Sequence, residues 1–332
     1  MTHTFTRAAL SLLALALLTG AALAQDPGVA FPATSEASDQ KAGSLLYYNA
    51  YTSDATNPKT SDTRINITNT NSQLSVAVHL FFVNGANCQV ADSFICLTEN
   101  QTATFKTSDL DPGTTGYIVA LATFSNGVPR QFNSLIGDEY VKFATGHTAN
   151  LGAVAFSKLT AANVLSTDGT LAGLFFDGRI LAGSYNRAPR VVAADNIPAR
   201  ADGNDTLLIL NRVGGDLSTS GANLGNMFGI LYDDAETPLS FTTSGGCQLR
   251  QSINNAFPRT APRVEAHIPS GRSGWLKING TADIGIVGAV INRGTGDKAF
   301  NGGRNLHHLT LSGANTLVIP IFPSNCPDDP QP

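Results

Sequence analysis

Short stretches of alternating apolar and polar residues indicate that this chain is built from β-strands. Ile65 and Ile67 alternate with polar residues within Thr63–Thr68, which is typical of a strand with one buried face. Ser75–Val83 is apolar on both faces and predicts a central strand that is covered on both sides. Further strands are expected at Thr102–Lys106, Gly116–Phe124 and Phe132–Phe143. Ala153–Val164 is the one helix candidate after the N-terminal segment.

The same order of features returns in the second half of the chain. Val191–Ala194 and Asn204–Asn211 correspond to Leu45–Ala50 and Ser61–Thr68. The further pairs are Met227–Tyr232 with His79–Val83, Gly274–Ile278 with Gly116–Ala120, and Gly285–Asn292 with Phe132–Glu139. This agreement in order indicates an internal duplication, with an insertion in the second copy. The alternative is a chance similarity between β-rich segments.

The predicted fold is all-β, with two tandem antiparallel β-sandwich domains over residues 41–187 and 188–332. A parallel sheet would need a crossover helix between successive strands, and the pattern offers almost none. Each copy is long enough to enclose its own hydrophobic core. We therefore expect each domain to be independent of the other.

The N-terminus has the organisation of a cleavable signal peptide over residues 1–24. Arg7 precedes an apolar run, Ala8–Leu18, that is too short to span a bilayer, and Ala22-Leu23-Ala24 forms a cleavage site before Gln25. The alternative is an N-terminal anchor helix. Residues 25–40 are rich in Pro, Ala, Ser and acids and are expected to form a flexible leader. We expect a protein that is secreted, held at the cell surface or kept in the periplasm, with no membrane span in the mature chain.

All four cysteines lie in the part of the chain that would be exported. Four cysteines allow three pairings. Because only seven residues separate Cys88 from Cys96, we predict that this pair joins adjacent strands, which leaves Cys247 to pair with Cys326. A metal site would need closer spacings or nearby histidines. Two structural disulfides, each inside one predicted domain, fit an oxidising compartment.

Charge and composition narrow the class of partner. The chain has 21 basic and 25 acidic residues, a formal charge of −4, and no basic run. It therefore lacks the electrostatic signature of a protein that binds nucleic acid or an anionic membrane. Charged residues make up 14% of the chain, against about 25% in an average domain. The surface is expected to be rich in Thr, Ser, Asn and Gly.

The sequence contains no motif that predicts catalysis or a cofactor. It has no nucleophile elbow, zinc-protease motif, phosphate-binding loop or dinucleotide fingerprint. The histidines of the exported part are His79, His147, His267, His307 and His308. None has a His or Cys two residues away on its own face of a strand. We predict no catalytic residue, no metal and no cofactor, although a metal site assembled from distant residues stays open.

Carboxylates cluster in three places. The clusters are Asp109 with Asp111, Asp138 with Glu139, and Asp233 with Asp234 and Glu236. A calcium loop would need six to eight oxygen ligands, and a glycosidase needs two carboxylates across a cleft, usually with aromatic platforms. The single tryptophan, Trp275, falls at the start of an expected core strand. The turn at Asp111-Pro112-Gly113 accounts for its own carboxylate. Calcium binding and glycosidase activity remain open alternatives.

Two resemblances accompany this pattern. The stretches Lys41–Leu46, Asp62–Asn69 and Phe132–Glu139 resemble a group of secreted bacterial β-proteins without an assigned function. Ser273–Ile278, with Gly288 downstream, is similar to a strand pair of bacterial extracellular Ig-like sandwiches. Both resemblances imply an extracellular β-sandwich protein of a bacterium, and neither implies a catalytic residue.

Three functions from different classes follow from these observations. The first is a secreted, non-enzymatic structural or adhesive protein that acts through surface contacts with an extracellular partner of unknown identity. The second is a ligand-binding module, for example for carbohydrate, which exposed aromatic residues on one sheet face would favour. The third is a hydrolase whose site is assembled from distant residues, which a histidine beside a carboxylate and a hydroxyl in one cleft would favour.

Overall fold

The computed structural model describes residues 31–296, 299 and 301–327. The predicted signal peptide lies outside these residues. From Ala33 onward the chain forms one compact unit. Almost all of its regular structure is strand, with only short helices at α2 (Thr107–Leu110), η1 (Arg200–Asp202) and α3 (Val264–His267). The prediction of an all-β fold is confirmed. No helix in the described part of the chain is long and apolar enough to cross a membrane.

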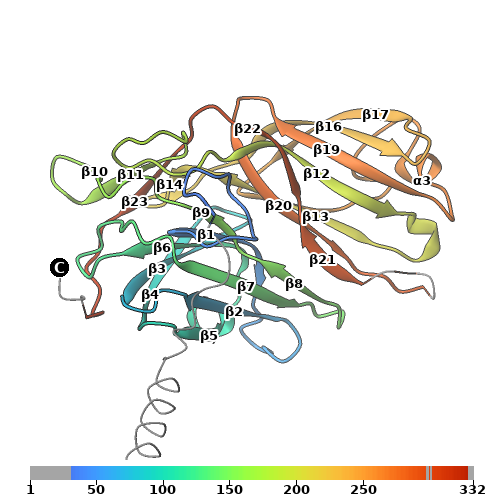
Figure 1. The fold of residues 1–332 in the computed structure, drawn as a ribbon. Coiled ribbons are helices and arrows are strands. Elements are labelled where there is room, and N and C mark those ends of the chain that lie inside the picture. Colours follow the sequence, from blue (N-terminus) through green and yellow to red (C-terminus); the bar gives the residue numbers. More distant parts are fainter. Residues whose placement is uncertain (1–30, 297–298, 300, 328–332) are drawn as a thin grey trace, which may run out of the picture. The chain divides into compact units, whose positions relative to one another are not determined.

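Two antiparallel sheets contain most strands of the first half (Figure 1). Sheet A has the order β4 (Val90–Leu97), β3 (Val76–Asn84), β6 (Thr115–Thr123), β1 (Leu45–Thr52) and β9 (Val154–Phe156). Sheet B has the order β5 (Thr102–Lys106), β2 (Asp62–Asn69), β7 (Leu135–Lys142) and β8 (Thr148–Gly152). The prediction of a helix at 153–164 was wrong. The start of this segment forms strand β9, which pairs with β1 and buries Val154 and Phe156.

Two further sheets contain most strands of the second half. Sheet C has the order β17 (Pro238–Gly245), β16 (Gly225–Asp233), β19 (Ser273–Gly280), β12 (Pro189–Pro198) and β22 (His307–Leu311). Sheet D has the order β18 (Gln248–Ser252), β13 (Thr206–Val213), β20 (Gly285–Asn292) and β21 (Gly302–Asn305). Position by position, sheet C repeats the strand order of sheet A, and sheet D repeats that of sheet B. The helix α3 precedes β19 as α2 precedes β6.

A fifth sheet, sheet E, joins the two halves. Its order is β10 (Val164–Leu165), β11 (Leu171–Phe175), β23 (Thr316–Pro320), β14 (Gly215–Asp216) and β15 (Ser220–Gly221). Strand β11 lies before the expected domain boundary at residue 187, whereas β23 and β14 lie after it. The C-terminal strand β23 pairs with both, antiparallel to β11 and parallel to β14. The two halves therefore share backbone hydrogen bonds.

Each pair of sheets from one half packs face to face through a hydrophobic cluster. Between sheets A and B the cluster includes Leu46, Tyr48, Ile65, Ile67, Val78, Leu80, Phe82, Ile118 and Leu135. Between sheets C and D it includes Val192, Leu208, Leu210, Met227, Leu231, Leu276, Ile278, Ile286 and Val290. Burial of apolar side chains at about 25 cal/mol per Å² is the main force that holds such layers together.

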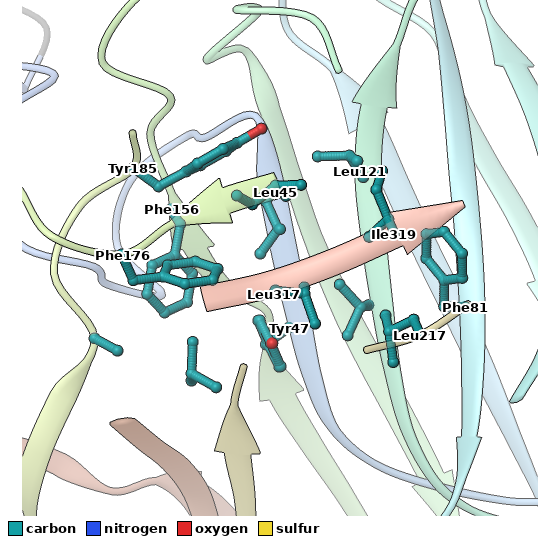
Figure 2. Packing of buried hydrophobic residues seen from close by; sticks show 14 of the residues in the cluster. Leu45, Tyr47, Phe81, Leu121, Phe156, Phe176, Tyr185, Leu217, Leu317 and Ile319 are labelled. Atoms are coloured by element: carbon teal, nitrogen blue, oxygen red, sulfur yellow. The ribbon is translucent and has the colours of Figure 1, made fainter. Parts of the chain in front are cut away.

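Two more clusters bury the opposite faces of sheets A and D. One packs sheet A against sheet E, and Figure 2 shows Leu317 and Ile319 of β23 among Leu45, Tyr47 and Phe81 of sheet A. The other joins Val141 and Leu151 of the first half to Leu207, Ile209, Ala289 and Ile291 of the second half. Strands β3 and β20 are consequently buried on both faces, which explains why their sequences are apolar throughout.

The disulfide pairing predicted from spacing was wrong. Cys88 bonds to Cys247, and Cys96 bonds to Cys326. Cys88 lies in the turn between β3 and β4, whereas Cys96 lies near the end of β4, and the length of that strand separates the two side chains. The first disulfide joins the two halves and the second attaches the C-terminal segment to sheet A. All four cysteines are bonded.

The described part of the expected flexible leader is docked on the body. Ala37 is buried and Ser38 forms a β-bridge with Ala155. The backbone carbonyl of Ala37 lies 3.1 Å from Nδ1 of His308. The side chain of Asn305 donates a hydrogen bond to Asp39. A segment with little apolar content is thus held by polar contacts with residues far away in sequence, which composition could not reveal.

Candidate binding surface

Aromatic residues lie on the outward face of sheet C. In β16, Met227 and Leu231 point into the cluster with sheet D, so Phe228, Ile230 and Tyr232 lie on the opposite face. Strand register places Trp275 beside Tyr232, Lys277 beside Ile230 and Asn279 beside Phe228. On the other side of β16, the exposed residues Ser240, Thr242 and Ser244 of β17 complete the face. We call this surface the outer C face.

Tyr232 and Trp275 form a stacked pair on the outer C face. Their ring centroids are 4.3 Å apart and their planes differ by 8°. Trp275 is 36% exposed, so it is not the core residue that the sequence predicted. Its neighbour Leu276 takes the core position instead, at 1% exposed. The strand was placed correctly, but the sequence did not indicate which of its residues face outward, and the same holds for Tyr232 on β16.

A hollow lined by hydroxyl and amide groups lies at the far end of the same two strands. Its volume is about 630 Å³. Asn226, Met227, Thr242, Thr243, Ser244 and Thr281 line it. Six residue steps along β16 separate Asn226 from Tyr232, a distance of ~20 Å at the usual rise of a strand. Asn226, Thr242 and Ser244 bring one side of this hollow onto the outer C face, whereas Met227 belongs to the face that packs against sheet D.

The histidines predicted to be scattered lie in separate environments. His79 is fully buried between the rings of Phe81 and Phe94, and its Nε2 lies 3.1 Å from Asp92. Burial lowers the pKa of His79 and Asp92 opposes that shift. His307 lies 3.5 Å from Asp195 at an exposed position. The described contacts place none of these histidines within hydrogen-bond distance of both a carboxylate and a Ser or Thr hydroxyl.

His147 and His267 are also held by the surrounding structure. His267 is buried at the end of α3. His147 lies in a cleft at the end of the β7–β8 hairpin, where its ring contacts the hydroxyl of Thr145 and the carbonyl of Gly294, each at 2.9 Å. No group of three metal-ligating side chains occurs in the part of the chain that the structure describes.

Each acidic cluster is engaged by neighbouring protein groups. Asp111 accepts a hydrogen bond of 2.6 Å from the Tyr51 hydroxyl, which fixes the turn at Asp111–Gly113. Asp233 accepts backbone hydrogen bonds from Ala235 and Thr237 in the turn after β16. The structure brings none of the three clusters into one cleft with another.

Glu139 is a deeply buried carboxyl group of the first half. It is fully buried, and its Oε1 accepts a 3.0 Å hydrogen bond from the backbone N–H of Ala50, whereas Oε2 has no hydrogen-bond partner. Burial raises the pKa of Glu139 well above its usual value, and the backbone hydrogen bonds oppose this only in part. Its protonated form is thereby favoured relative to that of an exposed carboxyl group. Its sequence neighbour Asp138 instead accepts a hydrogen bond from Asn66 at 2.9 Å.

Comparison with known proteins does not assign this chain to a family. No protein-family model and no curated protein sequence matches this chain. The features that bear on function are the outer C face, the buried junction between the halves and the cleft beside His147. Of these, the outer C face is the extended surface with exposed aromatic character.

Proposed function

We propose that this is a secreted, non-enzymatic structural or adhesive protein that acts through surface contacts, with two tandem β-sandwich domains over residues 41–187 and 188–332. The signal-peptide pattern over residues 1–24 supports export. Two disulfides fit an oxidising compartment outside the cytoplasm, at the cell surface or in the periplasm of a bacterium. The repeated strand order of the sheets supports the tandem arrangement.

The outer C face carries this proposal. Its side chains are mostly uncharged, and Ser240, Thr242 and Ser244 alternate along an exposed strand. Such a face binds by shape and hydrogen bonding, because little charge has to be removed from water when a partner covers it. The stacked rings of Tyr232 and Trp275 add rigid apolar area, which is typical of the residues that contribute most to binding.

Carbohydrate binding is the second candidate, and one observation favours it. The stacked pair of Tyr232 and Trp275 shares a face with a hollow of about 630 Å³ lined by hydroxyl and amide groups. Aromatic rings pack against the apolar faces of sugars, and hydroxyl and amide groups exchange hydrogen bonds with sugar hydroxyls. A neutral polysaccharide would contact both features at once.

The two candidates are separated by binding of the purified, exported protein to neutral polysaccharide and to protein-coated surfaces. Tyr232→Ala/Trp275→Ala is the test variant. Ile180→Ala is the matched control, because it removes a 71% exposed apolar side chain elsewhere. Adhesion through the outer C face predicts retention on at least one surface, loss of retention in the double variant and no change in the control. Retention on polysaccharide alone favours the carbohydrate-binding candidate.

Two results would contradict the proposal. One is equal retention of the double variant and the wild type, which would remove the outer C face from the contact. The other is release of reducing ends from a bound polysaccharide, which would show hydrolysis. Catalysis of that kind needs a reactive group and its acid or base within hydrogen-bond reach.

A further inference from the structure

A second cleft, on other elements than the outer C face, is lined by arginine. Its volume is about 430 Å³. Thr145 and His147 of the β7–β8 hairpin form one wall, and Arg200, Asp205, Arg293 and Thr295 of the second half form the other. No sequence motif pointed to Arg200 or Arg293, which are 93 positions apart in the chain.

Asp205 holds both arginines at the wall of the cleft. Nη1 of Arg200 donates to its Oδ1 at 2.7 Å, and Nη2 of Arg293 donates to its Oδ2 at 2.5 Å. Burial would raise the pKa of Asp205, but the hydrogen bonds and charges of the two arginines lower it overall. Both carboxylate oxygens are thus occupied by guanidinium groups, and the positions of the two cations are fixed relative to each other.

A third arginine packs beside this wall. Arg250 and Arg293 lie over the same ring, that of Phe143, at 5.4 and 5.7 Å from its centroid. Burial and the charge of Arg293 lower the pKa of Arg250 to about 10, so it stays charged at pH 7. Glu265 lies 3.6 Å from Arg200 on the exposed side of the cluster.

Among the residues that line the cleft, Arg200 and Arg293 are basic and Asp205 is acidic. Nη2 of Arg200 and Nη1 of Arg293 make no hydrogen bond to a described residue. The two side chains are 40% and 22% exposed, so these N–H groups are accessible to an anion that enters the cleft. Planar guanidinium groups are suited to carboxylate, phosphate or sulfate oxygens.

His147 positions the opposite wall of the cleft. Its Nε2 lies 2.9 Å from the carbonyl of Gly294, and its Nδ1 lies 2.9 Å from the hydroxyl of Thr145. This bridge holds the tip of the β7–β8 hairpin against the segment that follows β20. The width of the cleft is thereby set, and the Thr145 and Thr295 side chains line it with polar groups.

We propose that this cleft binds the oxyanion group of a small anionic ligand, with Arg200 and Arg293 as the residues that hold it. The group is a carboxylate, sulfate or phosphate, either free or carried by an acidic sugar. The inference does not depend on the proposed function, because none of its residues lies on the outer C face. The competing interpretation is that the arginines and Asp205 only join loops of the second half.

The test is isothermal titration calorimetry of the full exported protein with sodium sulfate, phosphate, glucuronate and, as the neutral comparison, glucose. Ionic strength is kept constant with chloride. Saturable binding of at least one anion, with none of glucose, is the expected result. Glucuronate alone would identify a sugar carboxylate, whereas sulfate or phosphate would identify a tetrahedral oxyanion.

Arg200→Gln is the main variant, because this side chain is 40% exposed and its loss leaves the packing on Phe143 intact. Its affinity should fall about tenfold or more, the effect expected when a charged hydrogen bond is removed. Arg272→Gln is the matched control, since it removes one exposed arginine from another ion pair, with Asp234, and should bind as the wild type does. Absence of saturable binding, equal binding of glucose, or unchanged affinity in Arg200→Gln would overturn the proposal.

Discussion

Cys88 and Cys247 are bonded across 159 positions of the chain, with their Cα atoms 5.2 Å apart. Cys88 follows β3 in the first half, and Cys247 lies between β17 and β18 in the second. The backbone adds to this link, since Gly221 donates a 2.7 Å hydrogen bond to the carbonyl of Cys88. The junction between the halves is therefore covalent as well as hydrophobic.

The first prediction concerns the stability that this bond provides. Replacing both Cys88 and Cys247 by Ser should lower the free energy of unfolding by about 5 kcal/mol in the chain-entropy model, because the closed loop is long. Urea unfolding of the variant and the wild type measures the loss. Non-reducing peptide mapping should show Cys88 linked to Cys247 and Cys96 linked to Cys326, and a Cys88–Cys96 peptide would contradict the structure.

The second prediction concerns the independence of the halves. A chain that ends at residue 187 should fail to fold cooperatively, because it lacks β23. Without β23 one edge of β11 has no partner strand, and the cluster around Tyr47 and Phe81 is open to water. Circular dichroism and thermal unfolding of this truncated chain test the point. A sharp unfolding transition close to that of the whole protein would show that the first half is self-sufficient.

The third prediction concerns Glu139 and pH. Its folded-state pKa lies above the unfolded value, so the folded protein keeps a proton that the unfolded chain loses above about pH 4.5. Stability should therefore fall as pH rises through this window, by about 1.4 kcal/mol for each pH unit. Glu139→Gln should remove this contribution and be more stable than the wild type at pH 8. Urea unfolding at pH 5 and pH 8 is the measurement.

Glu99→Gln supplies the control for that experiment, because it makes the same chemical change at an exposed position. It should leave the pH dependence of the wild type unaltered. A wild type whose stability rises between pH 5 and pH 8 in parallel with the Glu139→Gln variant would show that Glu139 is ionised in the folded protein.

The fourth prediction compares two neighbours on β19 that face opposite sides of the sheet. Trp275→Ala should cost about 1 kcal/mol or less, mainly the stacking with Tyr232. Leu276→Ala should cost about 2–5 kcal/mol, because it opens a cavity in the cluster between sheets C and D. Denaturant unfolding of both variants measures the difference. A larger loss for Trp275→Ala than for Leu276→Ala would reverse our assignment of the two faces.

Much of the secondary structure could be predicted because it depends on local alternation. The segment Gly285–Asn292 was predicted at the bounds that β20 has, and Ser75–Val83 is the central strand β3, covered on both faces. The segments paired across the two halves also take equivalent positions in the sheets, as Asn204–Asn211 in β13 and Ser61–Thr68 in β2 illustrate. Strand periodicity and turn residues are properties of neighbouring positions, and a single sequence contains them.

The local sequence pattern predicted the positions of strands better than it predicted which face of each strand is buried. Trp275 was placed at the start of an expected core strand, yet it is exposed and its neighbour Leu276 is buried. A run such as Gly274–Ile278 contains apolar residues in both phases, and only the packing of sheet C on sheet D selects one of them. The aromatic pair on the outer C face therefore depended on tertiary structure.

The sequence by itself determined the all-β class, the positions of most strands and the repeated order of features, since these follow from short-range chemistry. Only the tertiary structure decided the partners of Cys88 and Cys96, the sheet shared by both halves, and the meeting of Arg200 with Arg293 at Asp205. Each of these joins residues that are distant along the chain. Their proximity results from how buried apolar faces stack in layers. Because hydrophobic burial is non-directional, no single position in the sequence indicates which distant residue it will contact.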